Sequence, residues 1–360
     1  MLTWLVLFAA PTGAGASLTW SGGTPVDTHA AGIPLNAVAC ASTHECAAVD
    51  GQGREVTFDP SAPAGASAAV VSKFALTAIA CPSATQCTTV DVTGQEVTFN
   101  PQSPGVPTPA LVDTTGVPLA IACPAATQCT VVDTSGEEVT VNPQTSAVVG
   151  SAPIDSGSNP VLVGVDCPSA TQCSAVDTIG QQLTFNPQTS ATTSAGTADQ
   201  NSPAAVACPS LTQCVVVDSA GSEAGFGNSA FTTTIDGNGS SAVALADLAC
   251  PSVTECVAVD VNGNEVLTNP QLLSANHQPA PVDPGQRLIS VACPSANQCT
   301  AVDRSGAEVT FDPAAPGTPS VVLVDGTSKL TGVACPSTTL CSVIDVSGQE
   351  ATFAPGSAAA

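Results

Sequence analysis

Cysteine is the reactive residue type with the most regular spacing in this chain. The 16 cysteines form pairs with five residues between the two members of each pair. Zinc sites favour shorter spacings and a second pair nearby, so this pattern argues against a metal. On the two strands of a tight hairpin, the sulfur atoms of a pair would lie at a bridgeable distance. We therefore predict eight disulfides, whereas reduced thiols would require a cytosolic protein. The pairs are Cys40–Cys46, Cys81–Cys87, Cys123–Cys129, Cys167–Cys173, Cys208–Cys214, Cys250–Cys256, Cys293–Cys299 and Cys335–Cys341.

Aspartate recurs in two rows. Members of the first row stand three residues before a glycine, which is typical of a turn whose aspartate caps the backbone and whose glycine is left-handed. This row is Asp50, Asp91, Asp133, Asp177, Asp218, Asp260, Asp303 and Asp345. The second row ends a later apolar segment and comprises Asp27, Asp113, Asp155, Asp236, Asp283 and Asp325. The rows either cap their own turns or form an anionic surface for cations or a basic partner. Carboxylate and carbonyl oxygens are calcium ligands, so the first row is also a weak candidate set for Ca²⁺. No other metal and no cofactor is predicted.

The remaining reactive residues match no enzyme constellation. His29, His44 and His277 stand at different places along the sequence pattern, and no nucleophile elbow, phosphate-binding loop or H-E-x-x-H motif is present. Five glutamates recur at one position, which favours a structural role, although a carboxylate pair could also cleave glycosidic bonds. They are Glu96, Glu138, Glu265, Glu308 and Glu350.

Three arginines fall close to the two aspartate rows. Arg54 and Arg304 follow a first-row aspartate, and Arg287 follows a second-row aspartate. We expect Arg287 and Arg304 to be neighbours. Pairing with aspartates is the favoured role for all three, and binding of an anionic ligand is the alternative.

A repeat of about 42 residues must position these side chains. The stretch 81–102 reads CPSATQCTTVDVTGQEVTFNPQ, and its copies begin 41 to 44 residues apart. A period of this size is typical of propellers and other repeat arrays. The eight copies begin at Cys40, Cys81, Cys123, Cys167, Cys208, Cys250, Cys293 and Cys335.

Each copy has the length and pattern of four short strands. Residues 76–81 and 87–91 are apolar runs joined by turn residues, and 96–100 is a third run that Pro101 ends. Residues 108–113 are a looser fourth strand. Four antiparallel strands make one propeller blade, so the second–third and fourth–first turns share an edge. Both aspartate rows should then crowd one face of the disc, with the disulfide turns on the other face.

The two ends of the sequence predict how the repeats close. The eighth copy stops after its third strand, and residues 17–27 (SLTWSGGTPVD) supply an unpaired strand before the first copy. Pairing these segments removes the exposed sheet edges that an open β-solenoid, the alternative, would keep. We predict an all-β, eight-bladed β-propeller of four-stranded antiparallel blades, formed as a single domain by residues 17–360.

Residues 1–16 resemble a secretory signal peptide. Residues 2–10 are apolar and Ala14-Gly15-Ala16 fits a cleavage site, although the segment lacks a basic residue before the apolar run. A buried first strand is the alternative. No other stretch is long and apolar enough to span a membrane. We predict a secreted protein, either released or held at the cell surface through partners.

Composition limits the class of partner. The chain carries 29 acidic and 5 basic residues and a formal charge of −24, so nucleic acid and anionic membranes are poor partners. Only 3% of the residues are aromatic. The core must therefore rest on valine, alanine, leucine and threonine.

Copies such as ACPSATQCTTVDVTGQEVTF resemble the C-P-S-x-x-x-C-x-x-V-D-x-x-G repeats of secreted bacterial β-propeller proteins in the BNR, or Asp-box, sialidase-like group. The resemblance covers nearly all of residues 17–360 and implies the propeller fold. It does not imply sialidase activity, because that chemistry uses a tyrosine nucleophile and the chain has no tyrosine.

Two functions of different class follow from the sequence. The first is a secreted, non-enzymatic binding or scaffold propeller with an acidic face, acting as a monomer on a protein or glycan. The alternative is a carbohydrate-active hydrolase or lyase that uses carboxylates near the propeller channel.

Overall fold

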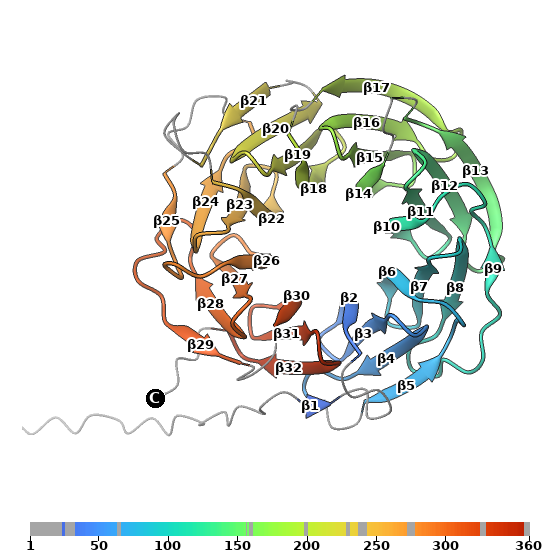
Figure 1. Cartoon of the computed structure of the whole chain (residues 1–360), viewed down its shortest axis with the longest axis horizontal. Helices are drawn as coiled ribbons and strands as arrows, with labels where there is room; N and C mark the ends of the chain where they lie inside the picture. Colours follow the sequence, from blue (N-terminus) through green and yellow to red (C-terminus); the bar gives the residue numbers. More distant parts are fainter. Residues whose placement is uncertain are drawn as a thin grey trace, which may run out of the picture.

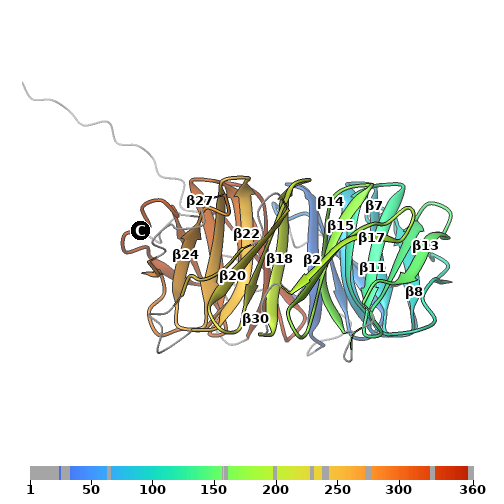
Figure 2. The same cartoon turned by 90° about the horizontal axis from the view of Figure 1, so that it is seen from above.

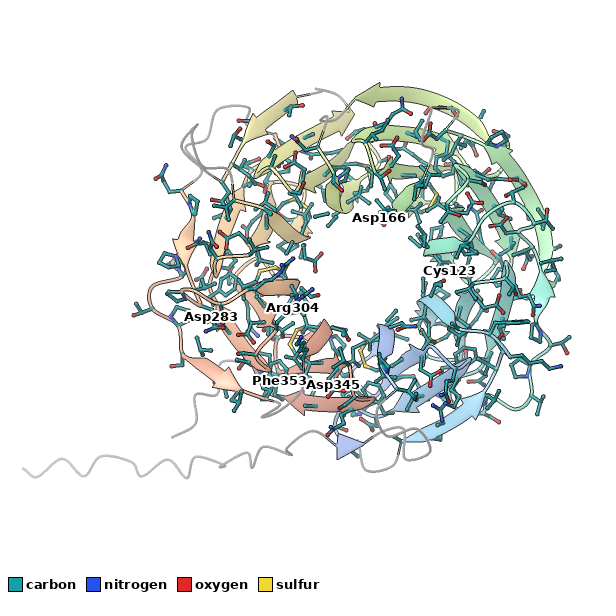
Figure 3. All side chains as sticks on the ribbon, viewed as in Figure 1. Cys123, Asp166, Asp283, Arg304, Asp345 and Phe353 are labelled. Carbon is teal, nitrogen blue, oxygen red and sulfur yellow. A yellow bond between two sulfur atoms is a disulfide. The ribbon has the colours of Figure 1, made fainter. Side chains whose placement is uncertain are left out.

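The chain forms a ring of eight sheets in the computed structural model (Figure 1), and the centre of the ring remains an open channel when side chains are drawn (Figure 3). Seen from the side, the ring is a disc (Figure 2). The structure describes residues 24–25, 33–62, 66–155, 157, 161–197, 201–227, 231–236, 243–271, 278–324 and 329–355. Within these ranges the regular elements are all strands. Each sheet has four strands paired in order, and every pairing is antiparallel. The predicted all-β eight-bladed propeller is confirmed.

The strands occupy four concentric positions. The innermost are β2 (Leu35–Ser42), β6 (Leu76–Ser83), β10 (Pro118–Ala125), β14 (Leu162–Ser169), β18 (Pro203–Ser210), β22 (Leu245–Ser252), β26 (Leu288–Ser295) and β30 (Leu330–Ser337). The second are β3 (Glu45–Asp50), β7 (Gln86–Asp91), β11 (Gln128–Asp133), β15 (Gln172–Asp177), β19 (Gln213–Asp218), β23 (Glu255–Asp260), β27 (Gln298–Asp303) and β31 (Leu340–Asp345).

The third and outermost strands complete each blade. The third are β4 (Arg54–Phe58), β8 (Gln95–Phe99), β12 (Glu137–Asn142), β16 (Gln181–Asn186), β20 (Ser222–Gly227), β24 (Asn264–Thr268), β28 (Ala307–Phe311) and β32 (Gln349–Phe353). The outermost are β5 (Ser67–Val70), β9 (Ala110–Leu111), β13 (Ala147–Pro153), β17 (Ala191–Thr197), β21 (Phe231–Thr234), β25 (Ala280–Pro281), β29 (Val321–Leu323) and β1 (Thr24–Pro25).

The last blade takes its outermost strand from the beginning of the chain. Thr24 pairs with Glu350 and Pro25 with Gln349, so β1 lies antiparallel to β32. Ring closure by the N-terminal strand is therefore confirmed at these two residues. The rest of the predicted 17–27 strand and the predicted signal peptide, 1–16, lie outside the described residues.

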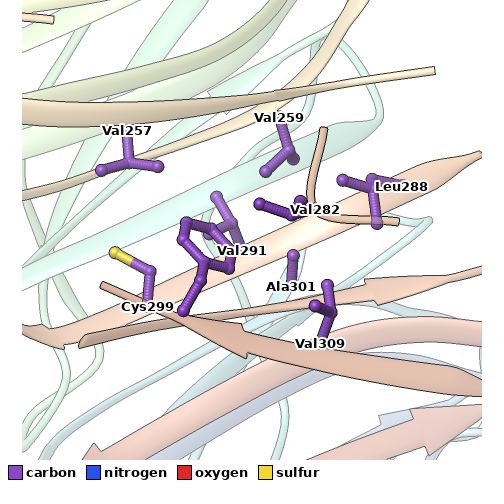
Figure 4. Close-up of a cluster of buried hydrophobic side chains, with 9 residues drawn as sticks. Val257, Val259, Val282, Leu288, Val291, Cys299, Ala301 and Val309 are labelled. Atoms are coloured by element: carbon purple, nitrogen blue, oxygen red, sulfur yellow. The ribbon is translucent and has the colours of Figure 1, made fainter. Parts of the chain in front are cut away.

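The core lies between neighbouring blades. One such cluster joins Val257 and Val259 of β23 to Leu288, Val291 and Cys299 of the next blade (Figure 4). A phenylalanine ends several third strands and sits opposite the second cysteine of its blade, as in the pairs Cys87–Phe99 and Cys299–Phe311. All eight predicted disulfides are present, with Cα atoms 4.0 to 4.1 Å apart. Few aromatic rings suffice because each blade buries a disulfide and a valine-rich strand against its neighbour.

Candidate functional site

The first aspartate row caps the turns that join the second and third strands. In all eight blades one carboxylate oxygen accepts backbone N–H bonds from the residues two and four positions later. At Asp303, for example, Oδ1 accepts from Ser305 N at 2.9 Å and from Ala307 N at 2.8 Å. The glycine three residues after each aspartate has φ between 73° and 94°. The predicted capping role is therefore confirmed. Donors aimed at Oδ1 leave that oxygen poorly placed to hold a cation.

The second aspartate row meets the first row of the following blade. Thr115 Oγ1 lies 2.9 Å from Asp113 Oδ1 and 3.1 Å from Asp133 Oδ2, so one hydroxyl touches both rows. The same pairing joins Asp283 to Asp303. Burial, and to a lesser extent the facing carboxylate of Asp303, raises the pKa of Asp283 to about 6. Asp27 and Asp325 lie outside the described residues.

These carboxyl groups are buried, which corrects the expectation of an acidic face built from them. The described members of both rows are 0% to 5% exposed. The turns do lie together, because the fourth–first connection hydrogen-bonds to the second–third turn, as between Asp113 N and Gly94 O at 3.1 Å. Strand order placed the rows on one side of the disc. It gave no information on whether the side chains point outward or into the next blade.

The recurring glutamates are buried as well and do not border the channel. The sequence analysis named five of them, and the structure adds Glu55 and Glu223 at the same strand position, which Gln182 occupies in the fourth blade. All eight side chains are 0% to 3% exposed. Several bond a hydroxyl two residues later, such as Thr310 Oγ1 donating to Glu308 Oε2 at 2.8 Å. Others reach the next blade, as when Ser190 Oγ donates to Glu138 Oε1.

Burial raises the pKa of all seven glutamates and so favours their neutral form. It raises the pKa of Glu55 and Glu265 to about 8. It raises the pKa of Glu223, Glu308 and Glu350 to about 7. A neutral carboxyl group can donate one hydrogen bond, so it fits the polar layer between blades without a cation. The expected structural role is the one that the geometry supports.

Two channel-wall aspartates escaped the sequence analysis. Asp166 Oδ2 accepts a 2.7 Å bond from Cys208 N, and Asp247 Oδ2 accepts a 2.9 Å bond from Val291 N. Each carboxylate therefore joins the innermost strands of two neighbouring blades. The signal was available, because Asp166 stands where the other copies have alanine before the first cysteine.

The arginines divide into two groups. Arg54 pairs with Asp50 through an Nη2–Oδ2 contact of 2.8 Å and is buried, as the favoured role predicted. Arg287 and Arg304 are neighbours, since Arg304 N donates to Arg287 O at 3.2 Å. Both side chains are exposed, and no ion pair joins either to an acid within the described ranges. The predicted pairing with aspartates is thus not found for these two among the described residues.

A pocket of about 580 Å³ lies beside these arginines at the channel mouth. Four consecutive blades line it, through the residues that begin their innermost strands and through their second–third turns. Leu245, Ile289 and Leu330 contribute apolar surface, and Lys329 joins Arg287 and Arg304 as a third cation. Figure 3 places Arg304 at the rim of the channel, with Asp166 across the opening. Sequence reasoning missed Lys329 and the pocket.

Outside this pocket, the described residues give little support for histidine catalysis or for a metal site. His44 is exposed, with its Nδ1 3.4 Å from Asp59 Oδ2, while His29 and His277 lie outside the described residues. Where side chains are placed, no group of three or more His, Cys, Asp or Glu residues could hold a metal ion. The same part of the chain contains no helix long and apolar enough to cross a membrane.

Comparisons with known proteins support the fold and leave the family open. No family model and no curated protein matches the chain. The computationally designed Ika8 protein superposes with a TM-score of 0.73 at 10% identity, over 91% of this chain and 98% of that one. Saccharomyces cerevisiae Sqt1 superposes with a TM-score of 0.72 at 10% identity, over 90% of this chain and 97% of that one. The C-terminal WD40 domain of Sif2 superposes with a TM-score of 0.69 at 9% identity, over 92% of this chain and 98% of that one. The chain is thus an eight-bladed propeller with WD40-type neighbours, and its sequence resemblance to the Asp-box group is not confirmed.

Proposed function

We propose that this protein is an exported, non-enzymatic binding module that holds its ligand in the pocket at the channel mouth. The observation that carries the proposal is the pocket itself, whose volume of about 580 Å³ is within the range of small-molecule sites. Propellers commonly bind at the openings of their channels, where loops from several blades converge. Eight disulfides support folding in an oxidising compartment.

The competing function is a carbohydrate-active hydrolase or lyase. Such an enzyme needs a carboxyl pair in contact with its substrate. The recurring carboxyl pairs described above are almost fully buried and bonded to turn N–H groups or strand hydroxyls. This geometry favours binding over catalysis.

Two matched substitutions test the binding site. Val346 lines the pocket and Val92 does not, yet each follows the capping aspartate of its turn and each is 38% exposed. Replacing Val346 with tryptophan should fill part of the pocket, whereas Val92→Trp makes the same change elsewhere on the face. In ligand-observed NMR with a library of small molecules and glycan fragments, we expect binding to the wild type and to Val92→Trp, and its loss in Val346→Trp. Equal binding by both variants would move the site elsewhere.

Export is tested separately. When the chain is produced from residue 1 in a bacterial host, we expect the protein outside the cytosol, without residues 1–16 and without free thiols. N-terminal sequencing and thiol titration of the recovered protein measure this. A cytosolic protein that keeps residues 1–16 would contradict the export part of the proposal.

A further inference from the structure

We infer that the channel-mouth pocket selects a small organic anion with at least two negative charges and an apolar body. This inference rests on the proposed function and specifies its ligand class.

Positive charge is concentrated at this pocket. The whole chain has 5 lysine and arginine residues against 29 acidic ones. Three of the five, Arg287, Arg304 and Lys329, line this pocket. The fourth, Arg54, is buried against Asp50, and the fifth, Lys73, lies outside the lining. A chain that is otherwise poor in cations thus places most of them around one opening.

The three cations break the repeat at two defined positions. Arg287 and Lys329 each stand immediately before an innermost strand, where the other six copies carry Pro, Ala, Val, Val, Ser and Ala. Arg304 follows the capping aspartate, where the other seven copies are also uncharged. Within a blade, a backbone hydrogen bond joins these two positions, from Arg304 N to Arg287 O in one blade and from Val346 N to Lys329 O in the next. A residue needed by the repeat itself would recur, so these cations have a local purpose.

In the part of the chain that the structure describes, acidic side chains do not pair with the three cations. Asp303 precedes Arg304 directly, but its oxygens accept from Ser305 N, Ser305 Oγ and Ala307 N. Asp283 is 5% exposed and faces Asp303. Across the described ranges, no ion pair joins an acid to Arg287, Arg304 or Lys329. Their guanidinium and ammonium groups are therefore available to an oxyanion, which arginine binds through paired N–H donors.

The apolar wall specifies the rest of the ligand. Half-buried Ala246 and Ile289 line the pocket, together with Leu245 and Leu330, which are each 3% exposed. A bare inorganic anion would leave this surface without a partner, and a neutral molecule would leave the cations unused. An organic body bearing two or more carboxylate-type charges contacts both.

The test uses phthalate, its uncharged dimethyl ester and inorganic sulfate as probes on the full-length protein. NMR titration or calorimetry should show phthalate binding, at least about tenfold tighter than either other probe. The triple variant Arg287→Gln/Arg304→Gln/Lys329→Gln should weaken phthalate binding by about tenfold or more. Lys73→Gln removes a cation from the same face outside the pocket and should leave it unchanged. Binding should also weaken as sodium chloride is raised.

The outcomes separate this inference from the proposed function. If the dimethyl ester binds as well as phthalate, and Val346→Trp abolishes both, the pocket is a binding site but the charge selection is wrong. If sulfate competes equally with phthalate, the apolar part is wrong. Phthalate binding that survives the triple variant also overturns the inference. If no probe binds, and the library screen finds no ligand whose binding is lost in Val346→Trp, both the inference and the proposed function are wrong.

Discussion

Replacing Glu308 with glutamine should make the protein's stability less dependent on pH. Glu308 is 3% exposed, and burial raises its pKa from an ordinary value of 4.5 to about 7. Glutamine has nearly the same shape and no charge. The chain already carries glutamine at the equivalent position in another blade, where Gln182 Nε2 bonds Ser174 Oγ at 3.2 Å and also bonds Thr184 Oγ1. The substitution should therefore preserve the packing between blades.

The sign and size follow from proton linkage. Because the folded pKa is raised, the contribution of Glu308 to stability is fully present below its unfolded pKa and is lost as the pH rises through about 7. Between about pH 5 and about pH 7, a shift from 4.5 to about 7 removes about 2 kcal/mol from the free energy of unfolding. The other buried glutamates act in the same direction.

Urea unfolding at the two pH values, with the disulfides intact, measures this change. The wild type should lose stability on going to pH 7, and Glu308→Gln should lose about 2 kcal/mol less. The reverse substitution, Gln182→Glu, should add a similar pH dependence. Identical pH dependence in the wild type and Glu308→Gln would refute the assignment of a raised pKa to this group.

Three further predictions concern the turns, the carboxylates and the ring. Gly263→Ala should lower the free energy of unfolding by several kcal/mol, since φ is +88° and the added Cβ would lie 1.7 Å from Asp283 O. Gly285→Ala, with φ +82° and no atom within 4 Å of the added Cβ, should cost about 1 kcal/mol. Thermal melts compare the two variants, and equal losses of stability would contradict the close approach at Gly263. Calcium should raise the melting temperature no more than sodium chloride of equal ionic strength, because N–H donors occupy the capping aspartates; extra stabilisation by calcium would restore the metal hypothesis. Deleting residues 17–27 should lower the melting temperature or cause aggregation by exposing the edge of β32, and an unchanged melt would argue against closure by β1.

The sequence predicted the parts of the structure that repeat. Cys81 and Cys87 predicted a disulfide hairpin, and Asp91 with Gly94 predicted a capped turn, because spacing alone determines these local geometries. The burial of the Glu96 side chain was not predicted, since spacing along one strand does not reveal which face packs on the next blade. The pocket was not predicted, because its lining combines residues of four successive blades that are separate in the sequence. Its cations could have been noticed, as Arg287 and Lys329 occupy the same repeat position.

Native mass spectrometry can show whether the channel-mouth pocket binds a ligand without changing it chemically. The purified protein is incubated with a mixture of small anionic and neutral metabolites and glycan fragments, and the masses of the protein–ligand complex and of the free compounds are measured. We expect one ligand per chain, whose binding is lost in Val346→Trp and kept in Val92→Trp, and the released ligand should have a mass that is present in the starting mixture. A new mass that accumulates only with the wild-type protein, or equal retention by both variants, would contradict this expectation.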